Sequence, residues 1–235
     1  MARGQTRFGK FVLGSIPRVV GTVSQAETLV QLAAITNREC DIVEIRLDLI
    51  GANTPRWVEH AQAIEARGLP VVITIRLAEE GGQWTQPDEE RLPLFETAIR
   101  DLTAVDIELR SPILKEVSTL ANRHECALIV SHHDFKQTPP VGELKKIIAA
   151  ATEFASVVKI VTFTKTDEDV GVLRTLLHEK SSTPLCVMGM GPLGPQTRVK
   201  FPKLGSCLAY GYLDAPVAPN QVRASDLIRQ LKTLR

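Results

Sequence analysis

The sequence predicts a single-domain α/β protein, a (β/α)8 TIM barrel that spans residues 1–235. Two observations lead to this fold class. Eight short runs rich in Val, Ile and Leu have the length of strands, and segments with helical spacing lie between them. Eight such units of about 25–30 residues fill the chain, and a barrel of this kind takes about 250 residues. An open doubly wound sheet is the alternative, and no linker or low-complexity stretch marks a second domain.

The eight expected strands span residues 18–22, 41–49, 70–76, 105–110, 127–133, 156–163, 184–190 and 206–213. Between them, apolar residues recur three and four positions apart, as in Leu144, Ile147, Ile148 and Ala151, and in Val170, Leu173, Leu176 and Leu177. This spacing is typical of helices that cover a sheet. Helix starts are expected where a capping residue precedes a good first-turn residue: at Thr54-Pro55, Ser111-Pro112 and Thr166-Asp167, and at Asn220 for the last helix.

Composition and charge exclude several classes of protein. Apolar residues make up 44% of the chain and charged residues 23%, as in globular proteins. Lys and Arg total 28 against 27 for Asp and Glu, so neither nucleic acid nor a membrane surface is an expected partner. No apolar run approaches the ~20 residues of a membrane helix, which predicts a cytoplasmic protein. Four dispersed cysteines without a CxxC pair favour neither a metal site nor a disulfide framework.

Charged residues alternate with apolar ones on two of the expected strands. They are Glu44, Arg46 and Asp48 on the first, and Asp106, Glu108 and Arg110 on the second. The outer face of a barrel strand packs under helices, so these side chains are expected to point into the barrel. Unpaired buried charges cost several kcal/mol each. These residues therefore form structural ion pairs, with Glu44 or Glu108 neutralising an arginine, or they build a site.

Lys159 interrupts the apolar strand 156–163. Burial there disfavours the ammonium form and leaves a neutral amine, which is a nucleophile toward ketones. The alternative is a structural lysine paired with Glu44 or Glu108. Lys165 falls in a polar turn beyond the strand and is expected to be solvated.

His133 ends its strand and shares a face with Ser131, whereas His132 is expected to face the helices. A histidine beside an inward lysine suits general acid and base chemistry. Asp106 or Glu108 on the neighbouring strand is a candidate to orient its ring.

Residues 189–194 match the GxGxxG pattern, with Asp214 twenty residues after Gly194. In a dinucleotide-binding fold these glycines open a helix, but here Pro192 and Pro195 stiffen the segment and the helical pattern that follows is weak. We interpret the glycines as a turn that brings Arg198 back over the barrel mouth; a phosphate cradle is the alternative.

Six motifs follow one another along the chain. They are Glu44-Ile45-Arg46; Arg76 followed by Glu79-Glu80-Gly81-Gly82; Ser131-His132-His133-Asp134-Phe135; Val158-Lys159; Met188-Gly189-Met190 with Arg198; and Ala218-Pro219-Asn220-Gln221. In this order and spacing they resemble the type I 3-dehydroquinate dehydratase family over nearly the entire chain. The resemblance implies a homodimeric shikimate-pathway lyase that converts 3-dehydroquinate to 3-dehydroshikimate through an imine, without a cofactor.

The resemblance also implies roles for individual residues. Lys159 matches the lysine that forms the Schiff base, His133 the acid/base histidine, and Glu80 the acidic loop residue of the family's site. Arg198 would bind the substrate carboxylate, and Glu44, Arg46, Arg76 and Gln221 would hold its hydroxyls and the charge network. The chain has Val217 where the family often has serine, so one substrate contact is lost or supplied elsewhere.

Three other functions share parts of this pattern. A class I aldolase or transaldolase also uses an imine-forming lysine in a barrel but breaks a carbon–carbon bond. A non-catalytic barrel that binds a small acid would not need an amine in an apolar strand. A phosphate-binding isomerase would want a glycine-rich loop that residues 189–194 only half supply. Loops 77–88 and 213–219 are expected to close over the substrate.

Overall fold

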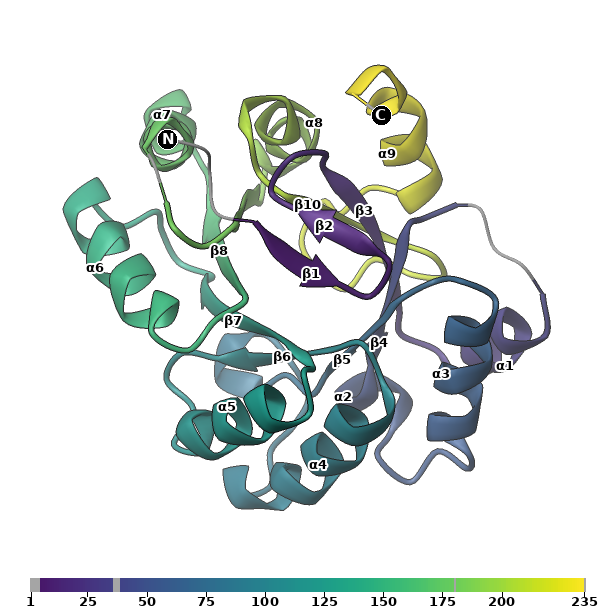
Figure 1. Cartoon of the computed structure of the whole chain (residues 1–235). Coiled ribbons are helices and arrows are strands. Elements are labelled where there is room, and N and C mark those ends of the chain that lie inside the picture. Colours follow the sequence, from purple (N-terminus) through teal and green to yellow (C-terminus); the bar gives the residue numbers. More distant parts are fainter. Residues whose placement is uncertain (1–4, 36–38, 180, 235) are drawn as a thin grey trace.

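The structure, a computed structural model, describes residues 5–35, 39–179 and 181–234. Within these residues eight parallel strands form the predicted barrel, ringed by helices (Figure 1). The strands are β3 (Arg18–Val23), β4 (Ile42–Arg46), β5 (Val71–Thr74), β6 (Ala104–Glu108), β7 (Ala127–Asp134), β8 (Val157–Phe163), β9 (Leu185–Met190) and β10 (Leu208–Tyr212). Their order is β10-β3-β4-β5-β6-β7-β8-β9. The backbone N–H of Cys207 donates to Leu185 O at 2.8 Å, which joins β10 to β9.

The outer ring consists of α1 (Ala26–Ala34), α3 (Trp57–Ala66), α4 (Leu92–Asp101), α5 (Leu114–Arg123), α6 (Val141–Thr152), α7 (Asp167–His178), α8 (Gly194–Leu204) and α9 (Ala224–Gln230). Short helices are α2 (Leu47–Ile50) and the 3₁₀ turns η1 (Ala78–Glu80), η2 (Asp88–Arg91) and η3 (Lys232–Leu234). Outward strand residues such as Val43 and Ile73 pack against helix residues such as Ile64 and Phe95. In the part of the chain that the structure describes, no helix is long and apolar enough to cross a membrane.

An N-terminal hairpin closes one end of the barrel and was not predicted. It pairs β1 (Thr6–Phe8) with β2 (Phe11–Leu13) and lies across the barrel in the foreground of Figure 1. Phe8 and Leu13 are fully buried in one cluster with inward strand residues such as Ile42. Three-residue strands are too short to show a period of two, so the sequence carries little signal for them.

Helix starts were harder to predict than strands. Thr166 is confirmed as the cap of α7, because its Oγ1 accepts a hydrogen bond from Asp169 N at 3.3 Å within a capping box. The other three predictions are wrong: Arg56, Ile113 and Arg223 precede α3, α5 and α9. Thr54 instead donates to Ile50 O at 2.6 Å, and Ser111 donates to Asp88 at 2.7 Å. Asn220 lies in the turn before α9 with a φ of 57°.

Three expectations for the charged strands and the glycine segment are also corrected. β4 ends at Arg46, so Asp48 lies in α2 and not on the strand. β6 ends at Glu108, and Arg110 is exposed rather than inward-facing. In the sequence, charged and apolar residues continue to alternate beyond Arg46 and Glu108. The strands end at these residues, so the alternation did not reveal where each strand ends. The helical pattern after residues 189–194 was judged weak, but an 11-residue helix, α8, begins there at Gly194.

Candidate active site

Seven of the eight predicted site residues line one small cavity at the carboxyl ends of the strands. They are Glu44, Arg46, Arg76, Glu80, His133, Lys159 and Gln221. The cavity has a volume of about 60 Å³, and a wider one of about 760 Å³ shares Arg46, Gly81 and Gln221 with it and leads to the surface. Arg198, the eighth residue, lies behind this lining.

Lys159 stands at the floor of the cavity, on β8. Its Nζ lies 2.9 Å from Asp106 Oδ2 and 3.7 Å from Glu44 Oε1. The ring of Tyr210 lies beneath it, with 4.1 Å between Nζ and the ring centroid. The sequence suggested Glu44 or Glu108 as the carboxylate that pairs with Lys159. Glu44 is within ion-pair distance of Nζ and Glu108 is not, and Asp106 lies closer than Glu44. The amine therefore lies between two carboxylates and an aromatic face, and it remains only 5% exposed.

Glu44 is held in place by two hydroxyls. Thr22 Oγ1 donates to Glu44 Oε2 and Thr74 Oγ1 donates to Glu44 Oε1, both at 2.8 Å. These threonines come from β3 and β5, on either side of β4. Thr22 lies opposite Glu44 in the strand register, and Thr74 lies opposite Arg46, two residues further along β4. The fold thus aims this carboxylate at Lys159 from three adjacent strands.

Asp106 is the central anion of the site. Arg76 Nη2 lies 2.6 Å from its Oδ1, Ser131 Oγ donates to the same oxygen at 2.7 Å, and Lys159 holds Oδ2. Burial by itself raises the pKa of Asp106, but the charges of Arg76 and Lys159 outweigh it and lower the pKa to about 2. Asp106 is therefore a permanent negative charge beside the amine.

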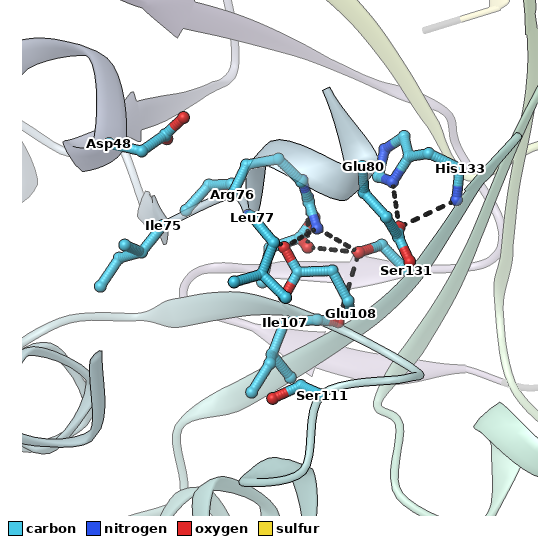
Figure 2. Close-up of polar contacts among 12 residues, drawn as sticks. Asp48, Ile75, Arg76, Leu77, Glu80, Ile107, Glu108, Ser111, Ser131 and His133 are labelled. Atoms are coloured by element: carbon cyan, nitrogen blue, oxygen red, sulfur yellow. Dashed lines mark hydrogen bonds and ion pairs between the residues drawn. The ribbon is translucent and has the colours of Figure 1, made fainter. Parts of the chain in front are cut away.

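Arg76 pairs with Asp106 and also with a second buried carboxylate, Glu108. Figure 2 shows its contacts with Glu108 and Ser131. Its Nη1 donates to Glu108 Oε1 at 3.0 Å and to Ser131 Oγ at 2.7 Å. Glu108 Oε2 accepts from Arg91 Nη1 at 2.8 Å. Arg110, which was expected on the same strand face as Glu108, is exposed, and the partners of Glu108 are Arg76 and Arg91.

His133 is oriented by Glu80, and neither Asp106 nor Glu108 contacts its ring. His133 Nδ1 lies 2.9 Å from Glu80 Oε2, and the His133 backbone N–H donates to the same oxygen at 3.0 Å (Figure 2). Because Nδ1 is occupied in this way, Nε2 is the nitrogen left for chemistry.

The protonation states of this pair follow from burial and charge. Burial raises the pKa of Glu80 to about 7, against the lowering effect of Arg76. Burial, together with the charges of Arg76 and Lys159, lowers the pKa of His133 well below its ordinary value. Near neutral pH the imidazole is therefore neutral, with a single ring proton, and a further proton taken up by the pair resides on the Glu80 carboxyl.

Two glycines allow the loop to place Glu80 on His133. A Cβ on Gly82 would lie 1.9 Å from Arg76 O, and one on Gly81 would lie 2.1 Å from the Phe135 ring. Gly81 also has a φ of 79°, in the left-handed region. Larger residues at either position would push the loop away from Arg76 and Phe135.

Arg46 points its guanidinium along the rim. Its Nε and Nη2 form a fork with the two oxygens of Asp48, at 2.9 and 2.8 Å. Asp48 Oδ2 also accepts from the backbone N–H of Gln83 at 3.1 Å. Arg46 is thereby tied to the loop that carries Glu80.

Arg198 comes from α8 and is 3% exposed. Its Nη1 donates to Tyr210 O at 2.8 Å and lies 3.1 Å from Met188 Sδ, while Nε is buried without a partner. Burial lowers its pKa to about 10. Among the ion pairs of the described residues none involves Arg198, so this cation lacks an anion behind a cavity that Tyr210 and Met188 line.

Gln221 and Val217 belong to the loop after β10. The Gln221 carbonyl Oε1 accepts from the Val217 backbone N–H at 2.8 Å, which leaves the amide group of Gln221 available to a ligand. Both residues line the cavity.

Sequence reasoning missed Arg91. It follows Glu89 and Glu90, a charge run typical of a solvated helix start, yet its side chain is fully buried. The one signal in the sequence was the alternation on residues 105–110. It places the carboxylate of Glu108 inside the barrel, where a buried negative charge needs a cation beside it.

Family, sequence and structure comparisons all find the same kind of protein. A family model described as type I 3-dehydroquinase matches residues 19–235. A 3-dehydroquinate dehydratase from Methanocella arvoryzae is 36% identical over 219 residues, which cover 93% of this chain and 97% of that protein. One from Thermococcus gammatolerans is 36% identical over 217 residues, or 91% of this chain and 96% of the relative. The crystal structure of 3-dehydroquinate dehydratase from Geobacillus kaustophilus has a TM-score of 0.88 and 26% identity, and the match covers 99% of this chain and 97% of that one.

Proposed function

Because this chain belongs to the type I 3-dehydroquinase family, we propose that it dehydrates 3-dehydroquinate through an imine at Lys159, with His133 as general acid and base. Membership of the family makes the chain a hydro-lyase of the shikimate pathway. The imine and the residue roles are the finer part of the proposal. The observation that carries them is the Lys159 amine at the cavity floor, 2.9 Å from Asp106 and on the strand beside His133.

The first steps form the imine. The neutral amine of Lys159 adds to the substrate ketone, and loss of the former carbonyl oxygen as water leaves an iminium ion. Asp106 and Glu44 stabilise the positive charge on this nitrogen, because their carboxylates lie 2.9 and 3.7 Å from Nζ. Tyr210 supports the same charge with its ring face.

The elimination then needs one acid/base group. His133 Nε2 removes a proton from the carbon next to the iminium carbon, which yields an enamine. The enamine electrons expel the β-hydroxyl, and the proton on His133 leaves with it as water. Addition of a second water to the iminium carbon releases the unsaturated ketone and restores the Lys159 amine. Glu80 keeps the His133 ring in one orientation throughout.

The substrate carboxylate requires a cation that is not already neutralised. Arg46 and Arg76 are both paired with carboxylates, whereas Arg198 has a buried Nε without a partner. We therefore assign the substrate carboxylate to Arg198, and the hydroxyls to Gln221, Glu44 and the rim around Arg46.

Trapping with sodium borohydride tests the proposal. Wild-type protein mixed with 3-dehydroquinate and borohydride should gain the mass of one reduced adduct, and peptide mapping should place it on Lys159. Lys159→Ala should gain none, and Lys165→Ala, a lysine outside the cavity, should behave as wild type. An adduct elsewhere, or none on folded wild-type protein, contradicts the mechanism. A retro-aldol assay with sugar phosphates is expected to give no turnover, which separates this enzyme from an aldolase.

Two further expectations carry over from the sequence. The family resemblance implies a homodimer, which should show twice the mass of one chain in light scattering, and a monomer would contradict it. The cytoplasmic location expected from the hydropathy of the chain is checked by fractionation of the source cells.

A further inference from the structure

We propose that Arg91 is a positioning residue for both reacting groups, because it holds the carboxylate of Glu108 on which Lys159 and the Glu80 loop depend. This inference rests on the proposed function and extends it to a residue outside the cavity lining. Arg91 does not line the cavity, so it acts on the reacting groups only through other side chains.

Arg91 ends the turn η2 and is completely enclosed by protein. Its Nη1 donates to Ile75 O at 2.5 Å and to Glu108 Oε2 at 2.8 Å. Asp88 pairs with the other edge of the guanidinium, and Ser111 Oγ lies 3.2 Å from Nη2. Burial of an arginine is costly unless every donor is used, and this one binds a backbone oxygen and two carboxylates. Its position is therefore specified by several contacts at once.

One path leads from Arg91 to the amine. Glu108 Oε1 lies 3.0 Å from Arg76 Nη1, Arg76 Nη2 lies 2.6 Å from Asp106 Oδ1, and Asp106 Oδ2 lies 2.9 Å from Lys159 Nζ. Cations and anions alternate along this path, and each member is at most 5% exposed. In such a dry environment each charge depends strongly on its neighbours.

A second path leads to the histidine. Glu108 Oε1 also accepts from the backbone N–H of Leu77 at 3.0 Å (Figure 2). Glu80 lies in the segment 77–91, which begins at Leu77 and ends at Arg91. The Glu108 carboxylate binds both ends of this segment. Glu80 in turn orients His133. Glu108 and its Arg91 partner thus connect the two catalytic groups.

Removal of the Arg91 charge should disturb both paths in a defined direction. Glu108 would keep only Arg76 as a cation and draw it away from Asp106. Asp106 would then lose its contact with Arg76 and shift, and Lys159 Nζ, which is bound to its other oxygen, would shift with it. The Lys159 amine would move from its place at the cavity floor, and the end of the loop that carries Glu80 would lose its anchor.

The test uses Arg91→Met and Arg91→Lys, with steady-state kinetics and borohydride trapping from pH 6 to 10. Arg91→Met should lower kcat about tenfold or more, as expected for misplaced reacting groups, with a much smaller change in KM. Borohydride trapping at Lys159 should slow as well, because the amine is misplaced. Arg91→Lys keeps the charge but cannot bind three acceptors in one plane, so its loss should be intermediate.

Phe95→Leu is the matched control, because Phe95 packs under the Arg91 guanidinium at 5.5 Å without joining the ion pairs. It should lower the melting temperature but keep the wild-type kcat and pH profile. Wild-type kinetics in folded Arg91→Met, or the same kinetic loss in Phe95→Leu, would overturn the inference. Should Arg91→Met not fold, Asp88→Asn replaces it with the same criteria. Absence of an adduct in wild-type protein would instead count against the proposed imine mechanism.

Discussion

Glu80 Oε2 contacts His133 twice, at 2.9 Å from Nδ1 and at 3.0 Å from the backbone N. One oxygen therefore fixes both the ring and the backbone of the residue that bears it. Glu80 comes from a loop and not from a neighbouring strand, so the orientation of the histidine depends on the conformation of that loop. Opening of the loop would release the ring, which links closure over a substrate to the readiness of the acid/base group.

Glu80 should make stability fall as the pH rises. Its pKa is raised from 4.5 to about 7, so the folded protein keeps a proton that the unfolded chain has lost over this window. Glu80→Gln removes this titration, so its free energy of unfolding relative to wild type should rise between pH 4.5 and 7, by up to about 3 kcal/mol. Urea unfolding of both proteins at several pH values measures it. A difference that is constant with pH would refute the assignment.

Gly82→Ala should inactivate the enzyme with little global unfolding. The added Cβ would lie 1.9 Å from Arg76 O, so the loop must move and carry Glu80 off His133. We expect kcat to fall at least about tenfold. Gly171→Ala in α7 is the control: its Cβ meets nothing within 4 Å, and it should stabilise the protein by about 0.5–1 kcal/mol at unchanged kcat. Equal kinetics for both variants would contradict this reading of the loop.

Val217→Ser should strengthen substrate binding. Val217 lines the cavity and offers no hydrogen bond from its side chain. One added hydroxyl contact stabilises the complex by about 1 kcal/mol, which corresponds to a KM about fivefold lower. Val217→Ala, which adds no hydroxyl, should not show this gain. An unchanged KM in Val217→Ser would mean that no substrate group faces this position.

Ligand should protect the loop 77–88 from proteolysis. The inner cavity is narrow, about 60 Å³, and Glu80 and Gly81 of this loop form part of its wall. A ligand in the cavity would contact this wall and hold the loop in place, so the loop should be cleaved less readily in the complex. Limited proteolysis with and without 3-dehydroquinate measures this, with fragment masses to locate the cut. Equal cleavage in both samples would argue against a lid.

The strands and the inward lysine were predictable because they follow from local rules. The period of two predicted for 41–49 and 105–110 specifies which side chains face inward over the parts that are strands, 42–46 and 104–108. The same rule put Ser131 and His133 on one face, whereas Lys159 was identified because it interrupts an apolar strand. Where alternation continued past the end of a strand the rule failed, as at Asp48 and Arg110.

The sequence by itself determined the eight-stranded barrel, the inward charges and, through family resemblance, the residues around the cavity. Only the tertiary structure decided which charge pairs with which: Asp106 with Lys159, and Glu80 with His133. It also buried Arg91 and placed the N-terminal hairpin under the barrel. The physical reason is that facing inward depends on one strand, whereas an ion pair depends on the register between strands and on the path of loops. Both are settled only when distant segments pack together.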